Sequence, residues 1–389
     1  MHSSLTLIII VVGTALFFDF TNGFHDTANA MATTIATRAL KPRLAVGLAS
    51  ILNFAGAFIS VSVAATIASG IVEQNLVTVP IVFAGLVGAI IWNLVTWYFS
   101  IPSSSSHALI GGVLGAMIAA VGSGAVIWSG ILAKVIIPAL LAPFICGGVA
   151  YLATRLSYGL TKSVPEEHAG RGFRLGQIAS SSLVALAHGT NDAQKTMGVV
   201  TLTLVAGDRL GAGEAIPFWV KVTCAAAIAA GTFSGGWRVI KTLGTRVTEI
   251  QAPQGFSAET GASSTILASS YFGFSLSTTQ VVSGGIMGSG LGRAGGVVHW
   301  RVVRNMVAAW VLTLPAAGLM GALAHEGVAA FPSDTSGVIA IGIVAAGIAL
   351  GLFGLARRTD HVTADNVLDT PPPSAPPPPL SPALGGAAA

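Results

Sequence analysis

Charged side chains are scarce in this sequence, and that scarcity excludes most classes of soluble protein. Only 9% of the 389 residues are Asp, Glu, Lys or Arg, against about 25% in a typical soluble chain. Hydrophobic residues make up 53%, and the mean hydropathy is +0.77. Too few polar side chains remain to cover a water-exposed surface. The sequence therefore excludes a soluble enzyme, a nucleic-acid-binding protein and a disordered chain, and it predicts an integral membrane protein.

Cysteine is almost absent as well. The two cysteines, Cys146 and Cys224, both lie inside apolar runs, which excludes a disulfide framework. The sequence shows no C-x-x-C pair and no zinc-ligand spacing. We therefore expect neither a structural metal site nor a cofactor.

Long apolar runs fill most of the chain, and a helix of roughly 20 apolar residues crosses a bilayer. Polar residues interrupt the first and the sixth run, and two runs, 104–121 and 277–291, are short enough to be re-entrant. The predicted fold class is an all-α polytopic membrane protein with two interrupted helices and two short helices. The eleven predicted segments are 4–37, 44–70, 77–99, 104–121, 128–153, 176–206, 214–235, 257–274, 277–291, 304–324 and 337–356.

The basic residues predict how the chain is oriented. In this layout 15 of the 19 Lys and Arg residues fall on one side, whereas Arg209 is the only basic residue in the opposite loops. By the positive-inside rule the basic side is cytoplasmic. We expect a plasma-membrane protein with its N-terminus outside and its C-terminus inside. The basic side holds Arg38, Lys41, Arg43, Arg155, Lys162, Arg171, Arg174, Arg238, Lys241, Arg246, Arg293, Arg301, Arg304, Arg357 and Arg358.

The sequence repeats itself in two places. NGFHDTANAM at 22–31 aligns with HGTNDAQKTM at 188–197, and SSSHALIGG at 104–112 aligns with STTQVVSGG at 277–285. Five spans separate the two copies if 104–121 counts as one crossing, and an odd number inverts the second copy, as in many secondary transporters. The predicted parts are a first repeat (1–160), a cytoplasmic linker (161–174), a second repeat (175–358) and a disordered Pro-rich cytoplasmic tail (359–389).

Two carboxylates lie at equivalent positions of the first pair of motifs. Asp26 and Asp192 each have amide neighbours, and a carboxylate inside a membrane span is costly and usually functional. Such oxygen ligands suit Na⁺, and a carboxylate equally carries a proton; the alternative is a set of polar contacts between helices. Gly23 and Gly189 would allow the backbone to unwind there. The predicted coupling-cation residues are Asn22, Asp26, Asn29, Asn191, Asp192 and Gln194.

Three further polar residues near these motifs are candidates for gating or for charge pairing. Asp19 precedes the first motif, and His25 and Lys195 lie within the two copies. Lys195 would either neutralise Asp192 or meet an anion directly.

The second pair of motifs places hydroxyl groups at the start of apolar segments. Such residues normally act as N-caps, but free N–H groups at a helix start also bind anions. Two starts that approach from inverted repeats would hold one tetrahedral oxyanion between them. The predicted anion-binding residues are Ser104, Ser105, Ser106, His107, Ser277, Thr278, Thr279 and Gln280.

The motifs NGFHDTANA at 22–30 and HGTNDAQK at 188–195 resemble the paired signature of the inorganic phosphate transporter (PiT) family, in particular its bacterial low-affinity branch. The resemblance covers roughly residues 5–356, and similar stretches are WNL at 92–94, PSSSSH at 102–107, GGWRVI at 235–240 and QGF at 254–256. The family's second PVSTTH element reads SLSTTQ at 275–280, so the hydroxyls are present but the proline and the imidazole are not.

This resemblance implies a symporter, not an enzyme, that moves inorganic phosphate into the cell by alternating access and uses a H⁺ or Na⁺ gradient. The Asp motifs would hold the cation and the Ser/Thr elements the phosphate. The bacterial branch implies proton coupling and phosphate carried with a divalent metal such as Mg²⁺, and we expect a homodimer in the lipid bilayer.

Three other functions compete with phosphate symport. A symporter of another oxyanion, such as sulfate, would use the same elements. A passive channel has little use for inverted, carboxylate-bearing breaks. An intramembrane aspartyl protease would need carboxylates about 3 Å apart that share a proton. The separate amide-rich neighbourhoods of Asp26 and Asp192 indicate two separate cation sites instead.

Overall fold

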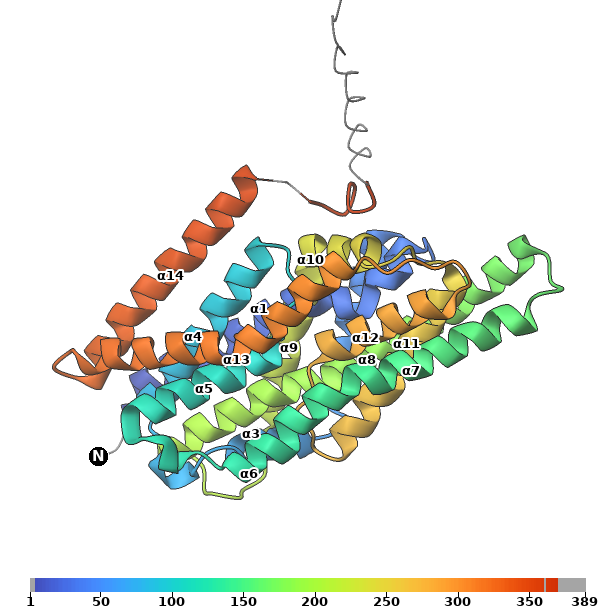
Figure 1. Ribbon diagram of the computed structural model, residues 1–389. Helices are drawn as coiled ribbons and strands as arrows, with labels where there is room; N and C mark the ends of the chain where they lie inside the picture. The colour runs from blue at the N-terminus through green and yellow to red at the C-terminus, as the bar shows by residue number, and fades with distance from the viewer. Residues whose placement is uncertain (1–3, 360–361, 370–389) are drawn as a thin grey trace, which may run out of the picture.

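The computed structural model describes residues 4–359 and 362–369, and every regular element within them is a helix apart from two isolated bridges (Figure 1). The all-α prediction is confirmed. The elements are α1 (Leu5–Ala36), α2 (Pro42–Gly56), α3 (Ser62–Ser69), η1 (Gln74–Leu76), α4 (Val79–Tyr98), α5 (Ser105–Val121), η2 (Ser123–Ala125), α6 (Trp128–Ile131), η3 (Leu132–Ile136), α7 (Ile137–Leu160), α8 (Glu166–Ala206), α9 (Phe218–Ser234), α10 (Trp237–Lys241), η4 (Thr242–Arg246), α11 (Ala252–Tyr271), α12 (Thr278–Gly292), α13 (Trp300–Ala329) and α14 (Asp334–Arg358).

Helices occupy all eleven predicted segments. By length and composition, α1, α4, the run from α6 to α7, α13 and α14 are each long and apolar enough to cross a membrane, and α9 with α10 and η4 would make a sixth span. These helices support a multi-pass membrane protein, while the number of eleven crossings stays a prediction. The helical segment 237–246 was not predicted, because its basic residues resemble a loop.

The prediction that the first and sixth segments are interrupted helices is wrong. Both α1 and α8 run without a break through their polar motifs. Gly23 packs against the backbone of Ile228 in α9, and Gly189 packs against that of Asn53 in α2, where a Cβ atom would collide. These glycines therefore permit close packing of helices and do not unwind them.

The breaks lie instead in the helices that follow α1 and α8. The first is the turn over residues 57–61, which separates α2 from α3. The second lies at Gly235 and Gly236, where α9 and the segment from α10 to η4 are bent by 61°. Equivalent places in the two halves of the chain thus carry the broken helices.

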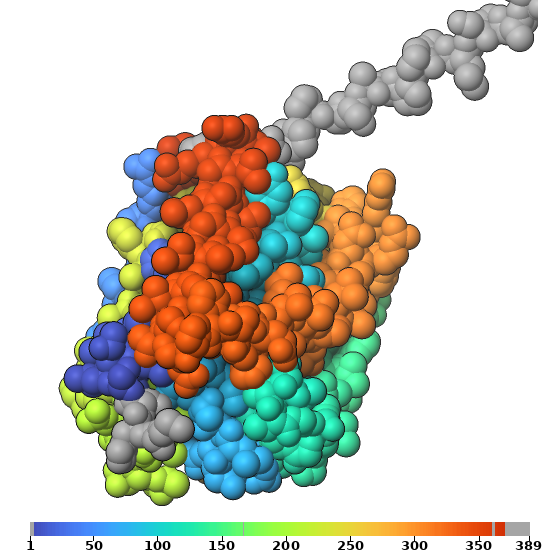
Figure 2. Space-filling view, turned by 90° about the vertical axis from the view of Figure 1, so that its left-hand side faces the viewer, coloured from blue at the N-terminus to red at the C-terminus, as the bar shows by residue number. Residues whose placement is uncertain are grey.

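The helices pack in a pattern that relates the two halves. Helix α1 packs against α9, and α8 packs against α2. The short helix α5 packs against α4 and α13, while its counterpart α12 packs against α11 and α7. Each short helix therefore joins its own half to a long helix of the other half, α5 to α13 and α12 to α7. Helix α14 has no counterpart, and it lies over the outside of the bundle next to α13 (Figure 2).

The two short helices begin inside the protein. Helix α5 has 17 residues and α12 has 15, so at 1.5 Å per residue they are about 25 and 22 Å long, less than the roughly 30 Å of a bilayer core. Ser104 accepts a hydrogen bond from the backbone N–H of His107 (3.1 Å), and Ser277 accepts one from that of Gln280 (3.3 Å). The ordinary N-cap role thus applies to these two serines.

The start of α1 and the end of α14 lie far apart, the first at the lower left of Figure 1 and the second at its top. Residues 166–174 of the predicted linker form the first turns of α8. Within the predicted tail, residues 362–369 are described, and Asp365 forms an exposed ion pair with Arg43 of α2 (3.0 Å). Residues 360–361 and 370–389 of that tail lie outside the described residues.

Candidate functional site

Helices α1 and α8 meet the starts of α5 and α12 at one buried polar centre. Asp26 is 1% exposed, Asp192 is fully buried, and Lys195 is 1% exposed. No residue of the two hydroxyl elements, 104–107 and 277–280, is more than 5% exposed. The centre is therefore closed to solvent from every side in this conformation.

Asp26 receives contacts from both short helices. Its Oδ2 accepts a hydrogen bond from Ser105 Oγ of α5 (2.7 Å), and its Oδ1 lies 3.4 Å from Thr279 Oγ1 of α12. The Nδ1 of His25 lies 2.7 Å from Oδ1. The first carboxylate is thus surrounded by hydroxyls and an imidazole.

Asp192 has an equivalent hydroxyl contact and a positively charged partner. Thr278 Oγ1 of α12 lies 3.3 Å from its Oδ2, which matches the contact between Ser105 and Asp26 in the first half. The ammonium of Lys195 lies 2.5 Å from Oδ1. The second carboxylate is therefore paired with a lysine of its own helix, whereas the partner of the first carboxylate on α1 is the imidazole of His25.

His188 links the two carboxylates. Its Nε2 lies 3.2 Å from Asp192 Oδ2 and 3.9 Å from Asp26 Oδ2, while its Nδ1 lies 3.1 Å from Asn53 Oδ1. The ligand atoms of Asp26, His188 and Asp192 all lie within 4.8 Å of one another, close enough to hold one cation. The expectation of two separate neighbourhoods is thus wrong, because the sequence does not show that α1 and α8 place their carboxylates beside one imidazole.

An aspartyl protease dyad does not match this geometry. Among the described residues, no hydrogen bond joins Asp26 to Asp192; the nearest partners are Ser105 and His25 for Asp26 and Lys195 for Asp192. A catalytic dyad instead shares one proton between adjacent carboxylates.

The hydroxyls that follow the N-caps point toward α1 and α8, the two helices that carry the Asp motifs (the motif helices). Asn29 Nδ2 donates to Thr278 Oγ1 (3.2 Å) and Thr279 Oγ1 (3.0 Å). The ammonium of Lys195 contacts Ser106 Oγ, which also lies 3.1 Å from the carbonyl oxygen of Leu276. Each short helix therefore contacts the motif helix of the other half.

Several other predicted residues are buried nearby but point elsewhere. Gln194 Oε1 accepts hydrogen bonds from the N–H groups of Val63 (2.8 Å) and Ala64 (3.3 Å), so it caps α3. Asn191 Nδ2 donates to Ser270 Oγ of α11 (2.9 Å). Within the described part of the chain, seven predicted residues keep polar atoms without a hydrogen-bond partner: Asp19 (both carboxylate oxygens), Asn22 (Oδ1), His25 (Nε2), Asn29 (Oδ1), His107 (both ring nitrogens), Asn191 (Oδ1) and Gln280 (Oε1).

Glu259 is a buried carboxylate that the sequence reasoning missed. It accepts hydrogen bonds from Thr33 (2.5 Å) and Thr34 (2.7 Å) of α1, and from Ser180 (2.6 Å) and Gln177 (3.1 Å) of α8. It is the only acidic residue of the predicted span 257–274, and that isolation was the available signal. His188 lies in the motif at 188–197, but the sequence predicts no role for it.

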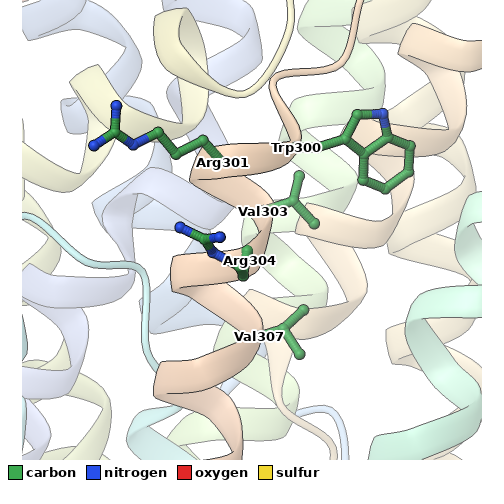
Figure 3. Close-up of a pocket in the computed structure, with 5 residues that line it drawn as sticks. All are labelled: Trp300, Arg301, Val303, Arg304 and Val307. Atoms are coloured by element: carbon green, nitrogen blue, oxygen red, sulfur yellow. The ribbon is translucent and has the colours of Figure 1, made fainter.

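A surface pocket on α13 lies apart from this centre. It has a volume of about 600 Å³ and is lined by Trp300, Arg301, Val303, Arg304 and Val307. Figure 3 shows the two arginines pointing to one side of the helix and the tryptophan and valines to the other. None of the predicted site residues lines this pocket, so it does not give access to the carboxylates.

Comparisons with known proteins agree with the motifs. A family model described as the phosphate transporter family matches residues 22–321. The probable low-affinity inorganic phosphate transporter of Mycobacterium tuberculosis (strain H37Rv) is 57% identical over 326 residues, which are 84% of this chain and 78% of that protein. The protein of the same description from Bacillus subtilis (strain 168) is 41% identical over 330 residues, 84% of this chain and 98% of that protein.

One solved structure has a similar fold. It is described as the sodium-dependent phosphate transporter, and it matches with a TM-score of 0.74 at 24% sequence identity. The match covers 83% of this chain and 98% of that one, so nearly the whole of that fold is present here.

Proposed function

This chain belongs to the phosphate transporter family, and on that premise we propose that it is a secondary active symporter that brings inorganic phosphate into the cell together with H⁺ or Na⁺. Membership of a transporter family accounts for the polar centre without any enzymatic step. The observation that carries the symport proposal is the direct contact of the hydroxyl elements with the carboxylates, Ser105 with Asp26 (2.7 Å) and Thr278 with Asp192 (3.3 Å).

Phosphate would bind between the starts of α5 and α12. The first turns of both helices supply N–H groups that point to the helix end, and a helix N-terminus favours an anion. The hydroxyls of residues 104–106 and 277–279 add donors from both halves, and His107 and Gln280 are buried next to them. In this proposal one tetrahedral anion is held from two sides.

The coupling cation would bind at the carboxylates. Without a cation, the negative charge of Asp26 lies one hydrogen bond away from Ser105, where it repels a phosphate ion. A proton or Na⁺ on Asp26 removes that repulsion, so cation and phosphate each strengthen the binding of the other. Such coupling is reciprocal by thermodynamic necessity. Both ions would therefore cross together.

Transport requires the closed centre to open to each side in turn. We propose that the two halves are inverted repeats that move against each other, with the cytoplasmic side identified by its basic residues. The breaks that follow α2 and α9 lie in the helices that pack on α8 and α1, so a change of angle there would reach both carboxylates.

Two details of the substrate follow from the chemistry of the site. Any tetrahedral oxyanion offers the same acceptors, so sulfate is a possible competitor, and family membership favours phosphate. A divalent metal bound to phosphate would lower its charge, and the bacterial branch that the motifs resemble implies this form. Uptake at fixed total phosphate, measured with and without Mg²⁺, separates the complex from the free ion.

The test of the proposal is uptake of radiolabelled phosphate by proteoliposomes that contain the purified protein. Inward proton and sodium gradients are imposed separately, with excess unlabelled sulfate in a parallel set. We expect accumulation above equilibrium under one of the gradients and little inhibition by sulfate. Phosphate movement that neither gradient accelerates would show a passive pathway and refute symport.

A further inference from the structure

Lys195 and Asn29 occupy the same place in the two halves of the chain. The alignment of 22–31 with 188–197 pairs them, and the alignment of 104–112 with 277–285 pairs Ser106 with Thr279. The structure reproduces both pairings in space, because the Lys195 ammonium contacts Ser106 Oγ and the Asn29 amide donates to Thr279 Oγ1 (3.0 Å). One half therefore has an ammonium where the other has a neutral amide.

The surroundings of the Lys195 ammonium are those of a small cation. Its three contacts are a carboxylate oxygen of Asp192 (2.5 Å), the carbonyl oxygen of Leu276 (2.8 Å) and the Ser106 hydroxyl. An ammonium has three donors, so this set of three oxygens uses all of them. Carboxylate, carbonyl and hydroxyl oxygens are also the ligands that hard cations take in proteins.

The equivalent place in the first half carries no such charge. The Asn29 amide nitrogen donates to two hydroxyls, while its Oδ1 has no hydrogen-bond partner among residues 4–359 and 362–369. The side chains that form hydrogen bonds with Asp26 there are those of Ser105, Thr279 and His25, and no lysine is among its partners within the described residues. The first half thus offers oxygen ligands to a cation, whereas the oxygen ligands of the second half already bind the ammonium of Lys195.

We propose that the Lys195 ammonium is a built-in cation that takes the place of one coupling ion, so that a single exchangeable cation, bound at Asp26, accompanies each phosphate. This inference rests on the symport function proposed above. Its consequence is energetic: each coupled cation multiplies the attainable phosphate accumulation by the gradient of that cation, and a tethered charge contributes nothing to that product. The tethered charge still attracts the anion to Ser106, so phosphate binding keeps its electrostatic support.

The experiment compares the cation dependence of wild type, Lys195→Asn and Lys195→Arg in proteoliposomes. Lys195→Asn gives the second half the residue of the first, and Lys195→Arg is the matched control because it keeps the charge. Initial phosphate uptake is measured against the concentration of the coupling cation. Since each exchangeable cation adds its own linkage to phosphate binding, we expect a Hill coefficient of about 1 for wild type and Lys195→Arg and about 2 for Lys195→Asn.

Other results would overturn the inference. A wild-type Hill coefficient near 2 would mean that two ions are exchanged despite Lys195. A Lys195→Asn variant that loses phosphate affinity at saturating cation, without a steeper cation dependence, would make Lys195 a direct phosphate ligand. If that variant does not fold, the reversal potential of wild-type transport decides, and a ratio of one cation per phosphate supports the inference while two refutes it.

The results that would refute symport differ from those that would refute the role of Lys195. Wild-type protein whose phosphate uptake depends on no cation would refute symport whatever Lys195 does. Wild-type protein with cation-coupled uptake, together with an unchanged Hill coefficient in Lys195→Asn, would refute only the role of Lys195.

Discussion

The two halves of this transporter share a scaffold but differ in charge at its centre. Asp26 is held by neutral hydroxyls and His25, whereas Asp192 is paired with the ammonium of Lys195 three residues along α8. The matching contacts of Ser105 and Thr278 show that the difference is not one of backbone arrangement. One substituted side chain, Lys195 in place of Asn29, therefore gives the two equivalent carboxylates different surroundings.

The largest effect on transport should appear when the carboxylate of either half is neutralised. Asp26→Asn removes the charge that an exchangeable cation would balance, and its neighbours Ser105 and Thr279 can still hydrogen-bond to the amide. We expect gradient-driven phosphate uptake to fall by at least about 100-fold, which corresponds to 2.7 kcal/mol or more, while the thermal stability of the detergent-purified protein stays close to wild type. Wild-type uptake in this variant would refute the cation role of Asp26.

Asp192→Asn should also abolish coupled uptake, but with a loss of stability that Asp26→Asn lacks. It leaves the Lys195 ammonium buried without its carboxylate, and breaking a buried ion pair in this way costs about 3–5 kcal/mol. Thermal unfolding followed by intrinsic fluorescence would measure this. The double variant Asp192→Asn with Lys195→Asn should regain much of the stability, because no unpaired charge remains. If Asp192→Asn alone is as stable as wild type, the ion pair is not as the structure describes it.

The close helix packing should be equally sensitive in both halves. Gly23→Ala and Gly189→Ala each place a Cβ against the backbone of a neighbouring helix, and such overpacking costs about 1–3 kcal/mol. Gly13→Ala is the matched control on α1, since no atom lies within 4 Å of the added Cβ. We expect lower unfolding temperatures for the first two variants and an unchanged unfolding temperature for the control. If Gly23→Ala unfolds at the wild-type temperature, α1 and α9 lie further apart than the structure shows.

The smallest effects on phosphate uptake should come from the removal of single hydroxyl groups. Ser105→Ala and Thr278→Ala each remove one donor, but the backbone N–H groups of α5 and α12 remain. A hydrogen bond to a charged group contributes about 1.5–3 kcal/mol, and one between neutral groups about 0.5–1.5. We expect the apparent KM for phosphate to rise roughly tenfold for Ser105→Ala, near 1.4 kcal/mol, and no more for Thr278→Ala.

The double variant Ser105→Ala with Thr278→Ala tests whether the two halves bind the same phosphate. If both hydroxyls touch one phosphate, their combined effect should depart from the sum of the single effects, since residues that share a partner couple. Strictly additive changes in affinity, measured by phosphate binding to the purified protein, would place the two hydroxyls at different ions.

Much of the fold could be predicted from composition and from the two pairs of motifs. Apolar runs predicted where the helices lie, including two short segments at 104–121 and 277–291, and the short helices begin one residue later, at Ser105 and Thr278. The interruptions of α1 and α8 were predicted wrongly, because polar side chains break an apolar run in the sequence without breaking the backbone hydrogen bonds of the helix that carries them.

The contacts between the halves could not be predicted. Residue types and spacing place Asn29 and Lys195 on helices, but the hydroxyls that they reach are supplied by the other half of the chain. Gln194 shows the same limit, since its amide caps α3 and does not face Asp192. His188 lies between both carboxylates only because α1 and α8 meet there.

The most direct test of this account is an experimental structure of the protein with phosphate bound in lipid nanodiscs. The account predicts one phosphate between the starts of α5 and α12, within hydrogen-bonding distance of hydroxyls from 104–106 and from 277–279, with Asp26 and Lys195 beside it. A phosphate more than about 5 Å from both elements, well beyond any hydrogen bond, would contradict it.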